Sequence, residues 1–147
     1  MAILIGIDPG EHTGFAVWDT ITRSFRVVAT LPLWKALDEV RRWNTAALMA
    51  PGALGIRVYF EDARLRTWFQ KETSSSEYRG KLMGAGAAKR DAKIWEEFLT
   101  DNRIAYTAIK PAAGQTKWRP EYWSKVTGWT GRTSEHARDA ALLVFNR

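Results

Sequence analysis

The chain has 147 residues, of which 46% are hydrophobic and 26% are charged, and it contains no cysteine. This length and composition predict one globular domain over residues 1–147, and the lack of cysteine excludes disulfides and thiolate metal sites. No apolar run approaches the roughly 18 residues that a membrane span needs, and the chain does not open with a basic segment followed by an apolar core. A cytoplasmic protein without membrane partners is therefore expected.

Positive charge is concentrated in two regions of the chain, whose formal net charge is +6. Residues 64–93 carry eight basic and three acidic side chains, and residues 110–147 carry seven and three. Two basic regions beside a near-neutral body are typical of a protein that binds nucleic acid.

The opening segment predicts a buried hairpin that ends its first strand on an acid. Residues 2–7 contain nothing polar, which favours a strand buried on both faces. Asp8 follows, then the turn residues Pro9 and Gly10, and residues 15–18 form the second strand. Asp8 is a candidate metal or catalytic carboxylate because a rigid strand fixes it at the edge of the core. A turn-initiating role before Pro-Gly is an equally good interpretation.

The remaining elements predict an α/β fold with a five-stranded mixed sheet flanked by helices. The fourth and fifth strands follow crossover connections, so they should run parallel to the first. In chain order, we expect a strand at 24–33, a helix at 34–49, a strand at 57–60, a mobile loop at 64–79, a helix at 81–102, a strand at 104–109, a helix at 120–126, a loop at 128–131, and a last helix capped by Ser134 that runs to the end of the chain.

A second acid occupies a place equivalent to that of Asp8. Glu61 comes directly after the strand at 57–60, and carboxyl ends of parallel strands meet at one edge of a sheet, where open α/β folds bind ligands. Asp62 is an alternative to Glu61, since a shift of one residue decides which acid faces inward.

The last helix adds two further candidates at its predicted inner face. His136 and Asp139 are three residues apart and so share one side of the helix. Carboxylates brought within ~4 Å repel by about 4 kcal/mol per pair at an effective dielectric of 20, so such a cluster needs protons or cations. Two metal ions could hold an attacking water and a leaving oxygen around a phosphate. The alternatives are a surface ion pair of Asp139 with Arg138 and an ordinary, satisfied histidine.

Three motifs carry a family resemblance: Ile5-Gly-Ile-Asp8-Pro-Gly with Thr13-Gly14, the strand that ends in Glu61, and Glu135-His136-Ala-Arg-Asp139-Ala-Ala. Together they resemble the RuvC family of Holliday junction resolvases, in particular its shorter phage-type members. The resemblance implies an RNase H-like fold, a homodimer formed through the long central helix, and a bacterial or phage-infected cell as the setting. It also implies a Mg²⁺-dependent endodeoxyribonuclease that resolves four-way DNA junctions.

The resemblance further implies the composition of the active site. Asp8, Glu61, His136 and Asp139 would bind two Mg²⁺ ions, with Mn²⁺ as an alternative, and Lys117 would lie near the scissile phosphate. Carboxylate and imidazole ligands in a chain without cysteine also favour such hard cations.

Basic and aromatic side chains follow Glu61 and recur near residue 120. Cations beside flat rings suit phosphates and unstacked bases, because stacking contributes about 1–3 kcal/mol per base. Trp118 and Trp123 belong to the second group, although most of the eight tryptophans, Trp43 and Trp95 among them, should be core residues. The predicted DNA-binding residues are Arg64, Arg66, Trp68, Phe69, Lys71, Lys89, Arg119 and Lys125.

Other functions stay open at this level. The acids would equally serve an RNase H-like nuclease that acts on structured RNA or on other branched DNA. A catalytically silent nucleic-acid-binding subunit is a third interpretation, but simple binding has no use for acids that face a polyanion. Actin-like and sugar kinases also open with Gly-Ile-Asp-x-Gly and Thr-Gly, but they need two such domains around the nucleotide.

Overall fold

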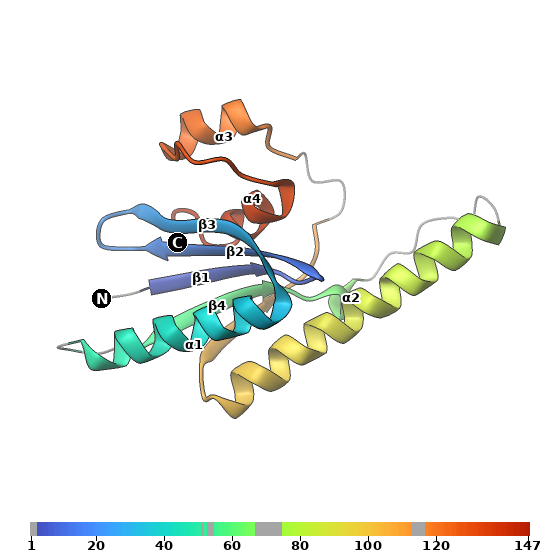
Figure 1. Cartoon of the computed structure of the whole chain (residues 1–147), viewed down its shortest axis with the longest axis horizontal. Coiled ribbons are helices and arrows are strands. Elements are labelled where there is room, and N and C mark those ends of the chain that lie inside the picture. The colour runs from blue at the N-terminus through green and yellow to red at the C-terminus, as the bar shows by residue number, and fades with distance from the viewer. Residues whose placement is uncertain (1–2, 51, 53–54, 67–74, 113–116) are drawn as a thin grey trace.

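The computed structural model describes residues 3–50, 52, 55–66, 75–112 and 117–147 (Figure 1). The elements are, in chain order, β1 (Ile3–Asp8), β2 (His12–Asp19), β3 (Ser24–Pro32), α1 (Leu33–Met49), β4 (Ile56–Glu61), the short 3-10 helix η1 (Ala63–Leu65), α2 (Ser75–Asp101), β5 (Ala105–Ile109), α3 (Pro120–Thr127) and α4 (Glu135–Leu142).

The five strands form one mixed sheet in the order β3-β2-β1-β4-β5. The hairpin of β1 and β2 and the pairing of β2 with β3 are antiparallel, whereas β4 runs parallel to β1 and β5 runs parallel to β4. This confirms the expected α/β class with a five-stranded mixed sheet, and it confirms the expected strand directions.

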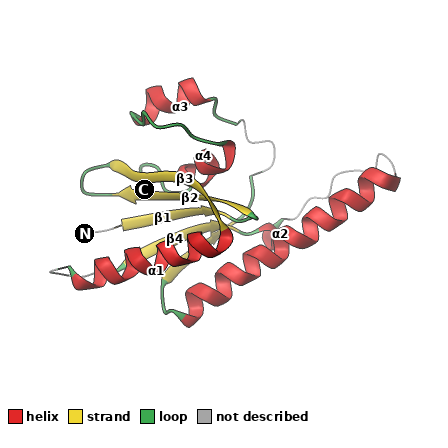
Figure 2. Ribbon diagram, viewed as in Figure 1, coloured by secondary structure: helices red, strands yellow, loops and turns green. Residues whose placement is uncertain are grey.

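The two faces of the sheet carry different helices (Figure 2). Alternate side chains of β1, such as Ile3, Ile5 and Ile7, join one buried cluster with residues of α1 and α2. Leu4, on the opposite face, joins a second cluster with residues of α3 and α4. The strict alternation along β1 therefore decides which helices each of its side chains meets.

Helix α4 lies directly on the backbone of the hairpin because two glycines leave room for it. A Cβ atom on Gly6 would lie 2.0 Å from the carbonyl oxygen of Ala140, and one on Gly14 would lie 2.0 Å from that of His136. Any larger residue at either position would push the helix away. These two glycines thus set the distance between α4 and the sheet.

Helix α2 is longer than the sequence indicates and extends well beyond the sheet (Figure 1). It begins at Ser75, so the loop predicted at 64–79 is wrong for residues 75–79, and η1 occupies its start. The C-terminal part packs on the core through Ala92, Trp95 and Leu99. From 79 to 90 nearly every side chain is exposed, which explains why apolar periodicity could not mark the start of the helix.

The last helix is shorter than expected. It ends at Leu142 instead of continuing to Arg147. The last residues of the chain form turns, and Asn146 has a positive φ of 58°. Ser134 caps the helix as predicted, since its side chain accepts a hydrogen bond from the amide of Ala137. None of the described helices has the length and apolarity needed to cross a membrane.

Candidate active site

The register of β1 and β4 brings two of the predicted acids to one edge. Ile7 pairs with Phe60, so the next residues along these parallel strands are Asp8 and Glu61. Both acids continue the alternate set of side chains that faces α4, because Ile7 and Phe60 belong to the buried cluster on the opposite face. Asp62 continues the set on the α1 and α2 side.

Helix α4 places its acid and its histidine at the same edge of the sheet. Nδ1 of His136 and Oδ2 of Asp8 are joined by a hydrogen bond of 2.8 Å. Asp139 lies one helical turn further along α4 and is about four-fifths buried, whereas the His136 ring is 57% exposed. Of the predicted acidic site, Asp8, His136 and Asp139 thus come together from elements more than 120 residues apart in the chain.

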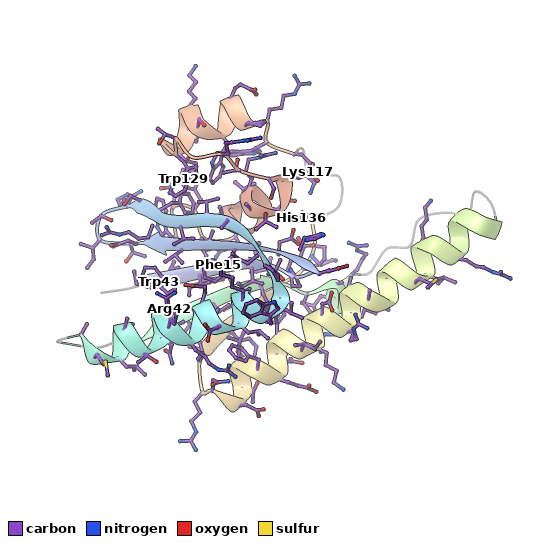
Figure 3. All side chains as sticks on the ribbon, viewed as in Figure 1. Phe15, Arg42, Trp43, Lys117, Trp129 and His136 are labelled. Atoms are coloured by element: carbon purple, nitrogen blue, oxygen red, sulfur yellow. The ribbon has the colours of Figure 1, made fainter. Side chains whose placement is uncertain are left out.

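Lys117 lies on the same side of the sheet, near His136 (Figure 3). Its ammonium group forms ion pairs with Asp139 and, over 3.1 Å, with Oε1 of Glu135. Glu135 was not among the predicted site residues, although its position four residues before Asp139 on one helix already places the two acids on a common face.

A buried arginine fixes the segment that carries Lys117. Arg138 is 8% exposed and donates from Nε to the carbonyl oxygen of Trp118 over 2.9 Å. Its Nη1 donates to the carbonyl oxygen and the hydroxyl of Thr133 over 2.9 and 3.0 Å. The alternative role for Arg138, an ion pair with Asp139, is therefore not what the structure shows. Sequence reasoning missed this role because it depends on the path of the segment before α3.

The positive groups on this side of the sheet do not fully offset the burial and mutual repulsion of its acids. Burial raises the pKa of Asp8 above its usual value, and this effect outweighs the hydrogen bond to His136. Burial, followed by the negative charges of Asp8 and Asp139, also raises the pKa of Glu61. Partial burial opposes the ammonium form of Lys117, but its bonds to Asp139 and Glu135 prevail and raise its pKa. Such perturbed groups are typical of functional sites.

The donor set suits a hard divalent cation, but the structure does not present an assembled metal centre. Asp8, Glu61 and Asp139 offer carboxylate oxygens, which Mg²⁺ prefers. Within the described ranges, however, no group of three or more His, Asp or Glu side chains is arranged to hold a metal ion. Two of the carboxylates are instead paired with His136 and Lys117.

Asp62 has an entirely different environment from its neighbour Glu61. It is 2% exposed, and both of its carboxylate oxygens accept hydrogen bonds from Arg64 at 2.7 to 3.1 Å. These bonds lower the pKa of Asp62 despite its burial. Arg64 also donates from Nη1 to Oε2 of Glu96 on α2 over 2.7 Å. Asp62 is thus committed to Arg64, whereas Glu61 lies on the side of the sheet that faces α4, next to Asp8.

Arg64, bound to Asp62 and Glu96, is described above, and the other residues predicted to contact DNA differ in environment. Trp68, Phe69 and Lys71 lie outside the described residues. Trp123 is fully buried in the second cluster, so its assignment to the basic surface is wrong, while Trp118 is partly buried beside it. The exposed members are Arg66 after η1, Lys89 on α2, and Arg119 and Lys125 at the two ends of α3.

The chain is similar to known proteins in structure. No protein-family model matches the sequence, and neither does any curated protein. Among solved structures, the chain is similar to "T. thermophilus RuvC in complex with Holliday junction substrate", with 16% identity, coverage of 96% of this chain and 90% of that chain, and a TM-score of 0.40. These values do not assign the chain to a family.

Proposed function

We propose that this protein is a metal-dependent endonuclease that cleaves branched DNA, with the four-way junction as its principal substrate. One observation carries the proposal: Asp8, Glu61 and Asp139, from β1, β4 and α4, gather at one edge of the sheet, where burial raises the pKa of Asp8 and of Glu61. A protein that only binds a polyanion gains nothing from such a cluster. A hydrolase that uses cations to act on a phosphate needs it.

The proposed metal ligands are Asp8, Glu61, Asp139 and His136. Mg²⁺, or Mn²⁺ in its place, would supply positive charge to the scissile phosphate when two ions are bound there. Burial and the neighbouring negative charges raise the pKa of Asp8 and of Glu61, and bound cations would offset both effects.

Lys117 has a role of its own in the proposal. Its ammonium group already lies against Asp139 and remains about half exposed, so it can turn toward a phosphate that reaches this edge. Arg138 keeps the backbone of this segment fixed to α4 during that change, because its bonds to Trp118 and Thr133 do not involve the Lys117 side chain.

The proposed DNA path crosses exposed cations on both sides of the acids. Arg66 and Lys89 lie on the η1 and α2 side, and Arg119 and Lys125 lie on α3. Contacts of this kind with phosphates provide affinity without reading sequence. The basic regions therefore hold the backbone, and the acids between them act on it.

We also propose that the active form is a homodimer through α2. The projecting part of this helix exposes Leu82 and Met83, and a Cβ atom on Gly84 or Gly86 would meet open space. Small residues beside apolar ones permit a close helix pair, and a twofold pair of sites suits two opposed strands of a junction. Sedimentation should show a dimer, whereas a monomer both alone and on junction DNA would contradict this.

The function is tested by a panel of substrates with and without Mg²⁺. We expect paired incisions in a four-way junction that require the metal, and slower cleavage of flaps and duplex DNA. Preferential cleavage of structured RNA would identify the RNase H-like alternative. Junction binding without cleavage under Mg²⁺ or Mn²⁺ would identify a silent binding subunit and refute the proposal.

A further inference from the structure

Three side chains form a clamp at the end of β4, on the side of the sheet opposite the acidic site. Arg64 uses all three guanidinium nitrogens: Nε and Nη2 donate to Asp62, and Nη1 donates to Glu96. The backbone amide of Arg64 also donates to Oδ1 of Asp62 over 2.9 Å. This Asp62–Arg64–Glu96 clamp joins the turn after β4 to helix α2.

The clamp acts on the residue directly after Glu61. The amide of Asp62 donates to the carbonyl oxygen of Ile109 over 2.8 Å, which extends the pairing of β4 with β5 by one residue. Because side chains alternate along an extended chain, a fixed Asp62 on one face holds Glu61 on the other. A rotation of this segment would bring the wrong acid to the α4 side.

The clamp also reaches the part of α2 that packs on the core. Glu96 follows the fully buried Trp95, whereas the side chains from 79 to 90 are nearly all exposed. The side chain of Glu96 is 40% exposed and that of Arg64 is 30% exposed, so their contact lies at the boundary of the core. A change in the direction of α2 would therefore act on Arg64 through Glu96 as well as on the buried residues Ala92 and Trp95.

We propose that Arg64 is a positioning residue, which holds Glu61 in the acidic site by tying Asp62 to Glu96 and so couples the orientation of α2 to that site. The inference rests on the proposed function for its catalytic consequence, but the coupling itself does not. It replaces the direct DNA contact predicted for Arg64, since all three of its side-chain nitrogens are bound to carboxylates.

Substitution of Glu96 tests the coupling most cleanly. Arg64→Ala would leave the buried carboxylate of Asp62 unpaired and risks unfolding. Glu96→Ala leaves the pair of Arg64 with Asp62 intact and removes only the connection to α2. Glu96→Gln keeps an oxygen that accepts from Nη1 and serves as the conservative variant. Glu97→Ala is the matched control, because Glu97 is the next residue on the same helix and pairs with Lys93 over 3.5 Å at the surface.

The first readout is independent of activity. In Glu96→Ala, backbone amide NMR signals of Glu61 and Asp62 should shift, whereas Glu97→Ala should leave both signals in place and Glu96→Gln should shift them less than Glu96→Ala. If the amide signals of Glu61 and Asp62 lie at the same positions in Glu96→Ala and Glu97→Ala, the coupling is overturned. If the wild-type protein cleaves no branched DNA but these shifts occur, the proposed function fails and the coupling stands.

The second readout separates positioning from a purely structural role. In Glu96→Ala, the single-turnover cleavage rate should fall by about 10–100-fold, the range for groups that orient metal ligands. The Kd for the junction should change by less than about twofold, and Glu96→Gln should recover most of the rate. A rate that falls only in proportion to the folded fraction, or that Glu97→Ala reduces equally, would overturn the role of Arg64 as a positioning residue.

Discussion

Glu61 and Asp62 are neighbours in the chain, yet they lie in regions of opposite character. Glu61 faces α4 among other acids, and burial and repulsion raise its pKa. Asp62 faces α2, is almost fully buried, and has a lowered pKa because Arg64 satisfies both of its oxygens. The comparison separates two uses of one functional group: paired charge stabilises a fold, whereas uncompensated charge at an edge is available to a cation or a substrate.

The largest expected effect concerns the three acids at the edge of the sheet that faces α4. Asp8→Asn, Glu61→Gln and Asp139→Asn should each reduce cleavage of a four-way junction by more than about 100-fold, because even the groups that support metal ligands contribute 10–100-fold. Junction binding should persist or improve, since a negative charge beside the phosphates is removed. Gel assays of binding and cleavage at one Mg²⁺ concentration measure both, and a wild-type rate in any variant would remove that residue from the site.

Asp62, which is paired with Arg64, should affect stability more than cleavage. Asp62→Asn should lower the free energy of unfolding by about 1–3 kcal/mol, because it weakens the bonds that satisfy Arg64. For a chain of this size, that loss corresponds to a decrease of about 2–4 °C in Tm per kcal/mol. Urea denaturation of Asp62→Asn beside Glu61→Gln makes the comparison directly. A stable Asp62→Asn and an unfolded Glu61→Gln would reverse our interpretation of the two regions.

The pH dependence of stability should also differ in sign between the two acids, with EDTA present. Asp62 has a pKa below its ordinary 3.8, so its contribution is present above that value and is lost as the pH falls through the folded-state pKa. The advantage of the wild type over Asp62→Asn should therefore shrink below about pH 4.

Glu61 has a pKa above its ordinary 4.5, so the folded state binds its proton more tightly than the unfolded state does. The wild type should lose stability relative to Glu61→Gln as the pH rises from 4.5 through the folded-state value. Chemical denaturation across pH 3–8 gives the free energy of unfolding of each variant relative to the wild type. If this difference changes with pH in the same direction for Asp62→Asn and Glu61→Gln, the prediction is contradicted.

The smallest expected effect concerns the salt dependence of DNA binding, compared between an exposed lysine and an arginine that is already paired. Exposed Lys125 should contact phosphate, and Lys125→Ala should flatten the plot of log K against log salt by about 0.9 for one lost contact. Arg42→Ala is the control, because Arg42 on α1 is already paired with Glu39 over 2.5 Å. Binding isotherms at several salt concentrations measure the slope, and an equal change in both variants would show that pairing does not distinguish these cations.

The sequence predicts the strands, their directions and the meeting of Asp8 with Glu61, because long apolar runs and crossover connections leave few alternatives. The alternation in β4 (Ile56–Glu61), with Ile56, Val58 and Phe60 on one face, also contained the answer to the choice between Glu61 and Asp62. The bonds of Lys117 and Arg138 were not predictable, since they depend on the path of an irregular segment. Basic and aromatic neighbours favour a DNA contact for Arg64, but Asp62, two positions before it, binds its guanidinium group.

The contact of α4 with Gly6 and Gly14 has a consequence for how this site tolerates change. Asp139 stands at a height above the sheet that is set by main-chain atoms, which every amino acid shares. The spacing of α4 from the sheet therefore does not depend on the identity of the side chains along the helix. The position of Asp139 thus depends on two residues that have no side chain. A single methyl group added at Gly6 or Gly14 would move α4, and Asp139 with it, away from the sheet.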